Sequence, residues 1–307
     1  MIKYILLLLA LLILCIYIYY KRDKKVQKKN ITTKFSIKNI GENTIWTYWD
    51  QGVENISPFS KKCIKTWKIK NPNHNGIIID RYNVFNYLNE SELPPNWKLI
   101  DVPQHKSDFV RLALLVKYGG VWIDISTICI KPINNIFKQT KSIEGFAIRS
   151  FSKNNDLSVF ENWFISCKKA SKLIKIWRDE MFKAFGKSTS MQQIDDKYFY
   201  DIDLQNISPG SYLTMHKIFT KCMQTNSEFA KLYKNDSNIF GAEETAGIYH
   251  THFNKDLSGF FREDNGFIEK LENVNTPILK FSNGLFHHYN ENTLNQPNTV
   301  MYTLLNP

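Results

Sequence analysis

Residues 104–118 show apolar side chains at helical spacing. Phe109, Leu112 and Leu115 recur at intervals of three and mark one face of a helix. The pair Gly119-Gly120 follows, and glycine is the residue that most easily adopts the left-handed conformation at a helix end. The pattern therefore predicts a helix that stops sharply before the next element.

A buried strand and a polar cluster are predicted around that stop. Val121 to Ile123 form a short, uninterrupted apolar run, which is typical of a strand that is covered on both faces. Asp124 comes directly after this run, at the carboxyl end, where open α/β sheets bind ligands. Asp108 and Arg111 are three residues apart, so they share one polar face of the preceding helix. We expect these three side chains to form a binding site.

The surrounding pattern alternates strands and helices, which predicts an α/β fold with a Rossmann-type nucleotide-binding half. Upstream, we expect strands at 45–49 and 76–80, a helix at 57–69 and a short helix at 83–88. Downstream, we expect strands at 127–131 and 145–150 and helices at 170–185 and 208–223, with an irregular polar stretch at 186–200.

The N-terminus has a different character. Residues 2–20 are almost wholly apolar, interrupted only by Lys3, and are long enough to cross a hydrocarbon core of about 30 Å. We therefore expect a transmembrane anchor at 1–20, a basic juxtamembrane linker at 21–40 and a folded domain at 41–307. Six basic residues follow the apolar run, whereas Lys3 is the only one at its N-terminal end, so the positive-inside rule favours a cytoplasmic domain over one in the Golgi or endoplasmic reticulum lumen.

Charge and cysteine content exclude several classes of function. The net charge is +11, but residues 1–30 carry seven of the basic residues and only one acidic residue. The rest of the chain has no basic stripe with interleaved aromatic residues, so we expect no nucleic-acid partner. The five cysteines are widely spaced without a C-x-x-C pair, which indicates neither a zinc site nor a disulfide framework.

The central block resembles the capsular polysaccharide synthesis glycosyltransferases, which are relatives of glycosyltransferase family 32. Residues 107–126 fill each position of the pattern S-D-x-x-R-x-x-L-L-x-x-Y-G-G-x-W-x-D-x-[ST]. Residues 45–52 resemble the family's opening I-W-x-x-W-x-Q-G motif, and residues 277–281 resemble its closing P-x-x-K-[LF] element. The resemblance implies a GT-A-like glycosyltransferase domain over 41–307, which transfers a sugar from a nucleotide-sugar donor to a glycan or polysaccharide acceptor with retention of configuration.

The resemblance also implies roles for individual residues. Asp108 would accept hydrogen bonds from hydroxyls of the donor sugar, and Arg111 would reach the sugar or the diphosphate with its planar fork. Lys280 would contact the diphosphate, and Trp46 and Trp49 would line the pocket for the base. Each of these side chains also has an ordinary structural interpretation, as a surface ion pair, a solvated lysine or a core aromatic.

A divalent metal is the expected cofactor. In related enzymes an Asp-x-Asp pair binds the donor and Mn²⁺ or Mg²⁺. Here the pair is Asp124 and Ser126, and a hydroxyl binds such an ion more weakly than a carboxylate does. His250 and His252 alternate on a presumed strand, and His252 is the candidate that would complete the metal site.

Two other functions fit parts of the pattern. The exchange of the second acidic residue for Ser126 is compatible with a catalytically weak protein that binds nucleotide sugars or glycans. A metal-dependent nucleotidyl or phosphoryl transferase could be built on a similar α/β half, although the chain has no G-x-x-x-x-G-K-[ST] loop.

Overall fold

The fold was analysed in a computed structural model of the chain. It describes residues 14, 17, 40–186, 188, 190–194, 196–243, 260, 262–263, 266, 268–269, 278–281 and 291–307. Contacts divide the chain into two units, Met1–Asn39 and Ile40–Pro307. The helices and strands with defined bounds belong to the second unit.

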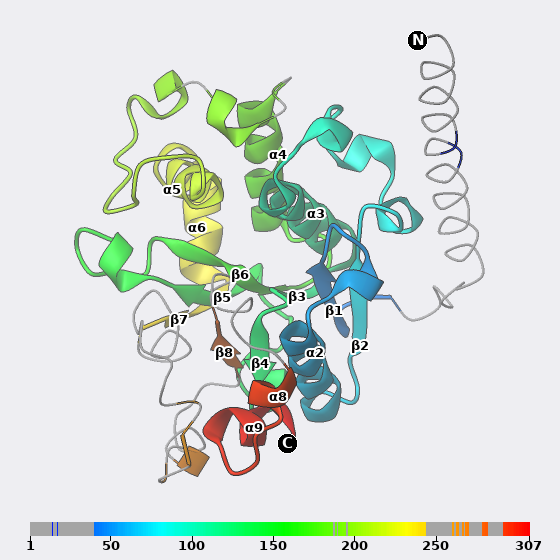
Figure 1. Ribbon diagram of the computed structural model, residues 1–307. Coiled ribbons are helices and arrows are strands. Elements are labelled where there is room, and N and C mark those ends of the chain that lie inside the picture. The colour runs from blue at the N-terminus through cyan, green and yellow to red at the C-terminus, as the bar shows by residue number, and fades with distance from the viewer. Residues whose placement is uncertain are drawn as a thin grey trace. The chain divides into compact units, whose positions relative to one another are not determined.

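A mixed six-stranded sheet forms the centre of this unit (Figure 1). Its strands, in spatial order, are β2 (Asn75–Ile79), β1 (Thr44–Tyr48), β3 (Gly120–Ile123), β6 (Phe160–Cys167), β5 (Ile143–Ala147) and β7 (Ser237–Gly241). Strand β1 is parallel to both β2 and β3, whereas β6 is antiparallel to β3 and β5, and β7 is parallel to β5. The chain is thus an α/β protein, as the sequence predicts.

A second sheet has two short antiparallel strands, β4 (Thr127–Cys129) and β8 (Ile278–Lys280). Thr127 is opposite Lys280 in this pairing. Two hydrogen bonds extend it, because the Phe281 amide donates to the Ser126 carbonyl and the Ser126 hydroxyl donates to the Phe281 carbonyl. The pairing brings a late segment of the chain directly beside the end of β3.

Helices cover both faces of the large sheet. They are α2 (Pro58–Lys70), α3 (Pro103–Tyr118), α4 (Lys172–Phe185), α5 (Thr214–Thr225), α6 (Ser227–Asn235), α8 (Glu291–Leu294) and α9 (Val300–Leu305). Figure 1 shows α3 to α6 on one side of the sheet and α2, α8, α9 and the small sheet on the other. Single 3-10 turns lie at Val53–Asn55, Val84–Asn86, Glu90–Glu92, Trp97–Leu99, Ile133–Asn135, Arg149–Phe151, Met191–Gln193 and Asp196–Phe199.

The two faces of the sheet pack into different hydrophobic clusters. Trp46 and Trp122 point to the side of α3 and α4, whereas Val121 and Ile123 point to the opposite cluster. All four side chains are buried, because side chains alternate along a strand and both faces are covered. This explains why the β3 sequence is continuously apolar.

Capping residues set the ends of the helices that carry the predicted pattern. The Ser57 hydroxyl accepts from the Ser60 amide and Pro58 occupies the first turn of α2, which matches the predicted start. Helix α3 ends at Gly119, which has a φ of 70° and whose amide donates to the Leu115 carbonyl. The predicted helix at 104–118 and its glycine stop are therefore confirmed.

Most predicted elements are present, with four differences. The predicted strand at 145–150 lies at Ile143–Ala147, and a 3-10 turn follows it at Arg149–Phe151. The predicted helix at 83–88 is a 3-10 turn, and the predicted strand at 127–131 ends at Cys129. The predicted helix at 208–223 begins later, at Thr214. Strands β6, β7 and β8 and helices α6, α8 and α9 were not predicted from the sequence, although β6 is eight residues long and lies beside β3.

The predicted membrane anchor at 1–20 lies outside the described residues, apart from Leu14 and Tyr17, and the predicted linker lies outside them up to Asn39. Within the described part of the chain, no helix combines the length and the apolar character needed to span a bilayer. The anchor and the side of the membrane that it implies therefore stay predictions.

Gly120 offers a test of how closely β1 and β3 pack. Its φ is 92°, and a Cβ atom at this position would lie 2.5 Å from the Thr44 carbonyl oxygen. We expect Gly120→Ala to lower the free energy of unfolding by at least about 2 kcal/mol, because it combines backbone strain with a steric overlap. Gly76→Ala is the matched control, since a Cβ atom there meets nothing within 4 Å. Equal denaturation midpoints for the two variants would contradict this packing.

Candidate active site

Arg111 is held between two carboxylates at the carboxyl end of β3. Its Nη1 donates to Asp108 Oδ1 over 2.9 Å, and its Nη2 donates to Asp124 Oδ1 over 3.1 Å. Arg111 is only 3% exposed and Asp108 is buried as well. A planar guanidinium bonded at two of its nitrogens has a fixed orientation. The three residues predicted from the sequence therefore form one cluster.

Trp122 supports this guanidinium from β3. The guanidinium carbon of Arg111 lies 4.7 Å from the centre of the Trp122 ring, which is a cation–π geometry. The Trp122 Nε1 also donates to Asp124 Oδ1 over 3.0 Å. One residue thus fixes both the arginine and the carboxylate, so the cluster is rigid before any ligand binds.

Lys280 joins the cluster from β8. Its Nζ donates to Asp124 Oδ2 over 3.0 Å and to Ser126 Oγ over 2.7 Å. Lys280 and Ser126 are both buried, while the side chain of Asp124 is 26% exposed. All three residues are candidates from the sequence, but the contact of Lys280 with the other two could not be predicted from it.

The two carboxylates have opposite pKa shifts. Burial would raise the pKa of Asp124, but the charges of Lys280 and Arg111 outweigh burial, and the pKa lies below its ordinary value. Burial raises the pKa of Asp108 to about 6, and the charges of Arg111 and His216 only reduce this effect. Asp124 is therefore a permanent anion near neutral pH, whereas Asp108 titrates just below it.

Strand β6 and helix α5 supply further side chains that the sequence analysis did not identify. The Asn162 Nδ2 donates to Asp108 Oδ1 over 3.4 Å, and Arg111 Nη1 lies 3.3 Å from the Met215 sulfur. His216 Nε2 lies 3.2 Å from Glu161 Oε2, and both of these side chains are buried. The signal that was missed is the largely apolar β6 segment, in which Glu161 and Asn162 follow Phe160 and precede Trp163.

Tyr212 precedes helix α5 and is 66% exposed, so its ring is accessible to a ligand. Desolvation, followed by the charges of Asp124 and Asp108, raises the pKa of its phenol.

The two tryptophans proposed for a base pocket occupy different environments. Trp46 has no exposed surface, and its Nε1 donates to the Gly119 carbonyl over 3.0 Å. It packs against Tyr118 and Tyr87, which agrees with the core interpretation of this residue, and a contact with a base stays a prediction. Trp49 is only half-buried, and its Nε1 has no hydrogen-bond partner among the described residues. Its role in a base pocket stays a prediction.

Asp50 follows Trp49 at the carboxyl end of β1 and collects several donors. Its carboxylate accepts from the Tyr48 hydroxyl over 2.5 Å and from Arg81, and Lys106 Nζ lies 3.8 Å away. Asp50 is almost fully buried, whereas the side chain of Arg81 is 45% exposed. This pair extends the polar edge of the sheet from β3 to β1 and β2.

The described donors do not fit the predicted Mn²⁺ or Mg²⁺. Asp124 Oδ1 accepts two hydrogen bonds and Oδ2 faces an ammonium, while Ser126 Oγ both donates and accepts. Within the described ranges, no three His, Cys, Asp or Glu residues lie close enough to hold a metal ion. His252, the third predicted ligand, lies outside these ranges, as does His250. The predicted metal thus has no matching set of ligands in the described part of the chain.

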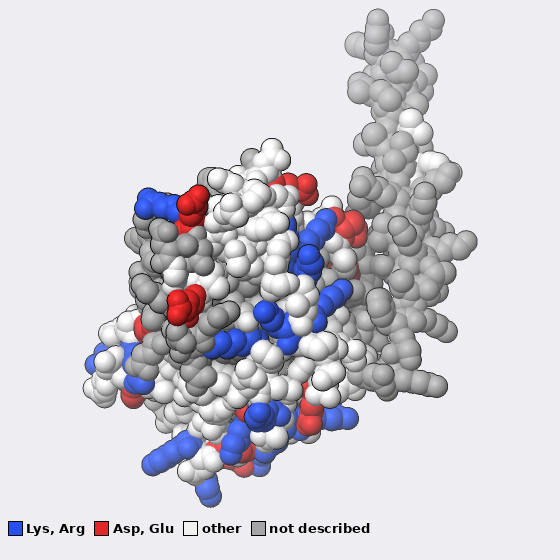
Figure 2. Space-filling model, turned by 90° about the horizontal axis from the view of Figure 1, so that it is seen from below, with Lys and Arg blue, Asp and Glu red and all other residues white. Residues whose placement is uncertain are grey.

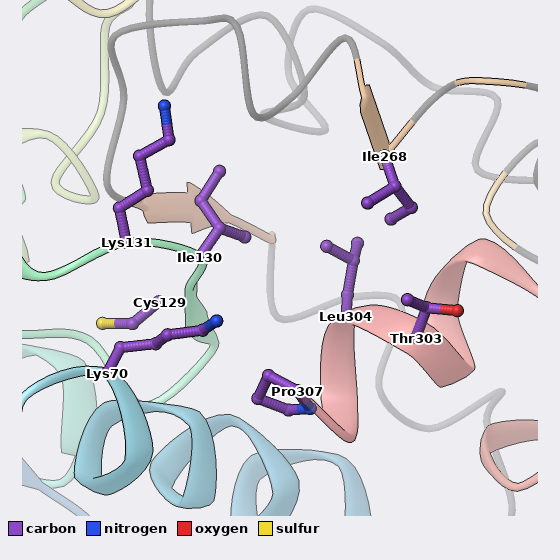
Figure 3. Close-up of a pocket in the computed structure, with 8 residues that line it drawn as sticks. All are labelled: Lys70, Cys129, Ile130, Lys131, Ile268, Thr303, Leu304 and Pro307. Carbon is purple, nitrogen blue, oxygen red and sulfur yellow. The ribbon is translucent and has the colours of Figure 1, made fainter.

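A cavity of about 130 Å³ lies elsewhere, between α2, β4 and α9 (Figure 3). Its lining comprises Lys70, Cys129, Ile130, Lys131, Ile268, Thr303, Leu304 and Pro307. It contains none of the predicted site residues and has room for only a few water molecules. Figure 2 shows a band of Lys and Arg across the middle of the face seen from below, with other basic and acidic residues nearer its edges. The buried charge cluster is the better candidate site, because it brings two carboxylates and two cations together.

Comparison with known proteins identifies relatives of the chain. It is 26% identical over 219 residues to the O-glycosyltransferase braB of Annulohypoxylon truncatum. The aligned region covers 63% of this chain and 51% of the relative. It is also 26% identical over 210 residues to the O-glycosyltransferase PaGT of Phomopsis amygdali, with 63% and 49% covered. The chain therefore spans about half the length of these relatives.

Two further comparisons concern structure and family. The solved structure of PaToxG Glycosyltransferase is 20% identical and covers 71% of this chain and 84% of its own, with a TM-score of 0.41, which is too low to establish a shared fold. The model of the family described as "Capsular polysaccharide synthesis protein" matches residues 14–252, which is most of the chain. The protein therefore belongs to the capsular polysaccharide synthesis protein family.

Proposed function

We propose that this protein is a nucleotide-sugar-dependent glycosyltransferase with a GT-A-like catalytic domain. The observation that carries the proposal is the buried chain of alternating charges formed by Asp108, Arg111, Asp124 and Lys280 at the end of β3. The similarity of the chain to two relatives that are named O-glycosyltransferases also supports the proposal. The acceptor that we propose is a glycan or polysaccharide, with retention of the anomeric configuration.

Sugar transfer needs the kind of charge that this cluster holds. The bond between the anomeric carbon and the diphosphate oxygen breaks, and its electron pair stays on that oxygen. The acceptor oxygen forms the new bond, so the products are a glycoside, a nucleoside diphosphate and a proton. Positive groups fixed near the departing diphosphate stabilise the charge that develops there, because they need not reorganise during the reaction. Arg111 and Lys280 are two such groups.

The carboxylates have distinct parts in this proposal. Asp124 holds both cations in place and presents its exposed edge to the donor. Asp108 accepts hydrogen bonds from hydroxyls of the donor sugar, beside the amide of Asn162. Tyr212 offers an exposed aromatic surface on which a sugar ring can stack. Together these groups orient the anomeric carbon toward the acceptor.

A screen for donor hydrolysis tests the function. Purified protein is incubated with a panel of nucleotide sugars, and the released nucleoside diphosphate is measured. We expect one donor to be turned over and Asp124→Asn to abolish this turnover while the fold stays intact, because the change removes the charge that holds Arg111 and Lys280. Asp203→Asn is the control, since Asp203 pairs with Lys153 on the surface. Wild-type turnover in Asp124→Asn would contradict the assignment, and binding without turnover would favour a binding protein.

The two-pronged geometry of Arg111 leads to a second prediction. Arg111→Lys keeps the charge but cannot bridge Asp108 and Asp124 with a planar fork. We expect donor binding to weaken by about 1.5 to 3 kcal/mol, which is the range for one hydrogen bond to a charged group. Arg178→Lys is a matched control, because Arg178 also bonds to a carboxylate, Asp179, and lies over an aromatic ring. Calorimetric titration with the active donor measures the affinity of each variant. If Arg111→Lys binds the donor as tightly as the wild type does, Arg111 has only a structural role.

The pKa of Asp108 makes a third prediction, about pH. Since Asp108 must be ionised to accept hydrogen bonds from the sugar, we expect kcat/KM to fall on the acid side with an apparent pKa of about 6. Its folded-state pKa is raised from 3.8, so its contribution to stability is present at low pH and is lost as the pH rises toward 6. Relative to wild type, Asp108→Asn should therefore gain up to about 3 kcal/mol of stability between pH 4 and pH 7.

Denaturant titrations at several pH values measure this gain. Asp203→Asn serves as the control, because interactions with Lys153 lower the pKa of that exposed carboxyl and the variant should not gain stability as the pH rises. An acid limb centred near pH 4, or a difference between Asp108→Asn and wild type that does not change with pH, would contradict the role of Asp108.

A further inference from the structure

We propose that the ammonium of Lys280 takes the place of a divalent cation, so that the donor diphosphate binds here without metal. This inference rests on the proposed function and identifies how the same site neutralises its substrate. It departs from the Mn²⁺ or Mg²⁺ that the resemblance to family 32 implies. The reasons lie in the contacts of Lys280, Asp124 and Ser126.

The position of Lys280 is the first reason. Its Nζ contacts Asp124 Oδ2 over 3.0 Å and Ser126 Oγ over 2.7 Å. These are the side chains at the two motif positions whose counterparts are carboxylates in Asp-x-Asp enzymes. A single cationic nitrogen therefore bridges the pair of residues that would otherwise bridge a metal ion. Lys280 is 5% exposed, so this contact is not a surface ion pair that solvent would screen.

The use of the oxygen atoms is the second reason. The Ser126 hydroxyl donates its proton to the Phe281 carbonyl over 2.8 Å and accepts from Lys280. Asp124 Oδ1 is bonded to Arg111 and Trp122. A metal ion needs several free oxygen ligands, usually with more than one carboxylate among them. Here the side-chain oxygens of both motif residues, Asp124 and Ser126, already face hydrogen-bond donors.

The balance of charge is the third reason. The carboxylates of Asp108 and Asp124 are matched by the two cations Arg111 and Lys280. A divalent ion would add two positive charges beside an ammonium and a guanidinium that are both buried. The negative charge of a diphosphate, in contrast, would be attracted to these two cations directly.

The fold holds Lys280 in this position. Its strand β8 pairs with β4, and Lys280 is in register with Thr127. Backbone and side-chain hydrogen bonds between Ser126 and Phe281 lock the two strands together next to the motif. Among the described residues, the ammonium contacts only Asp124 and Ser126 as side-chain acceptors, which takes up two of its three N–H groups and leaves one for a ligand. When the bond to the anomeric carbon breaks, this group can donate to the oxygen that keeps the electron pair.

Calorimetric titration with nucleoside diphosphates tests the proposal, using UDP, GDP, CDP and ADP in excess EDTA and again with Mn²⁺. We expect one nucleotide to bind wild-type protein with a Kd that differs less than threefold between the two conditions. Lys280→Met should weaken its binding at least tenfold in both, and Lys280→Arg, which keeps the charge, should restore part of the loss. Lys168→Met is the matched control, because Lys168 forms a similar pair with Asp236 away from the site.

A second measurement does not depend on substrate. The electron paramagnetic resonance signal of free Mn²⁺ is followed as protein alone is added, with Asp124→Asn to identify any binding at this site. We expect the wild-type protein and Asp124→Asn to lower the Mn²⁺ signal to the same extent. Thermal unfolding of each variant, followed by circular dichroism, separates lost binding from lost folding.

The outcomes distinguish the two proposals. Nucleotide binding that requires Mn²⁺, or Mn²⁺ binding that disappears in Asp124→Asn, would overturn the role of Lys280 and leave the proposed function standing. Wild-type nucleotide affinity in a folded Lys280→Met would do the same. Failure of every nucleotide to bind under both conditions would overturn the proposed function itself.

Discussion

The bridge from Asp108 through Arg111 to Asp124 is the interaction on which the rest of the site depends. A buried guanidinium is stable only when its charge and its N–H groups are matched, and these two carboxylates match it from a helix and from a strand end. Asp108 and Arg111 of helix α3 are consequently held against the carboxyl end of strand β3. Trp122 closes the arrangement by stacking on the guanidinium and donating to Asp124.

The sheet brings the remaining groups to this bridge. Strand β6 lies antiparallel to β3 and supplies Asn162, while the pairing of β4 with β8 supplies Lys280. The positive and negative groups alternate along the cluster, so each cation lies beside a carboxylate. A ligand with a diphosphate would meet this cluster at Asp124, whose side chain is the more exposed of the two carboxylates. The proposed chemistry follows from this combination of fixed charge and one-sided access.

The sequence predicted the first half of the fold well because local signals agree there. The β1, α2, β2, α3 and β3 segments carry clear hydrophobic periods, caps and glycine stops, and each was found close to its predicted bounds. Strand β6 was missed because Glu161 and Asn162 interrupt its apolar run. The contact of Lys280 with Asp124 joins residues 156 positions apart, so only the tertiary pairing of β4 and β8 reveals it. The sequence left two interpretations open for Trp46, because a core tryptophan and a binding tryptophan look alike in a sequence.

A crystal structure of the protein with a bound nucleoside diphosphate would test the central claim most directly. We expect the terminal phosphate to lie within hydrogen-bond distance of Lys280 and near Arg111, with no metal ion between the phosphate and Asp124. A nucleotide bound away from the cluster, for example beside the cavity between Lys70 and Lys131, would contradict the location of the site. A metal ion joining Asp124 to the phosphate, with Lys280 displaced, would contradict the role given to the ammonium.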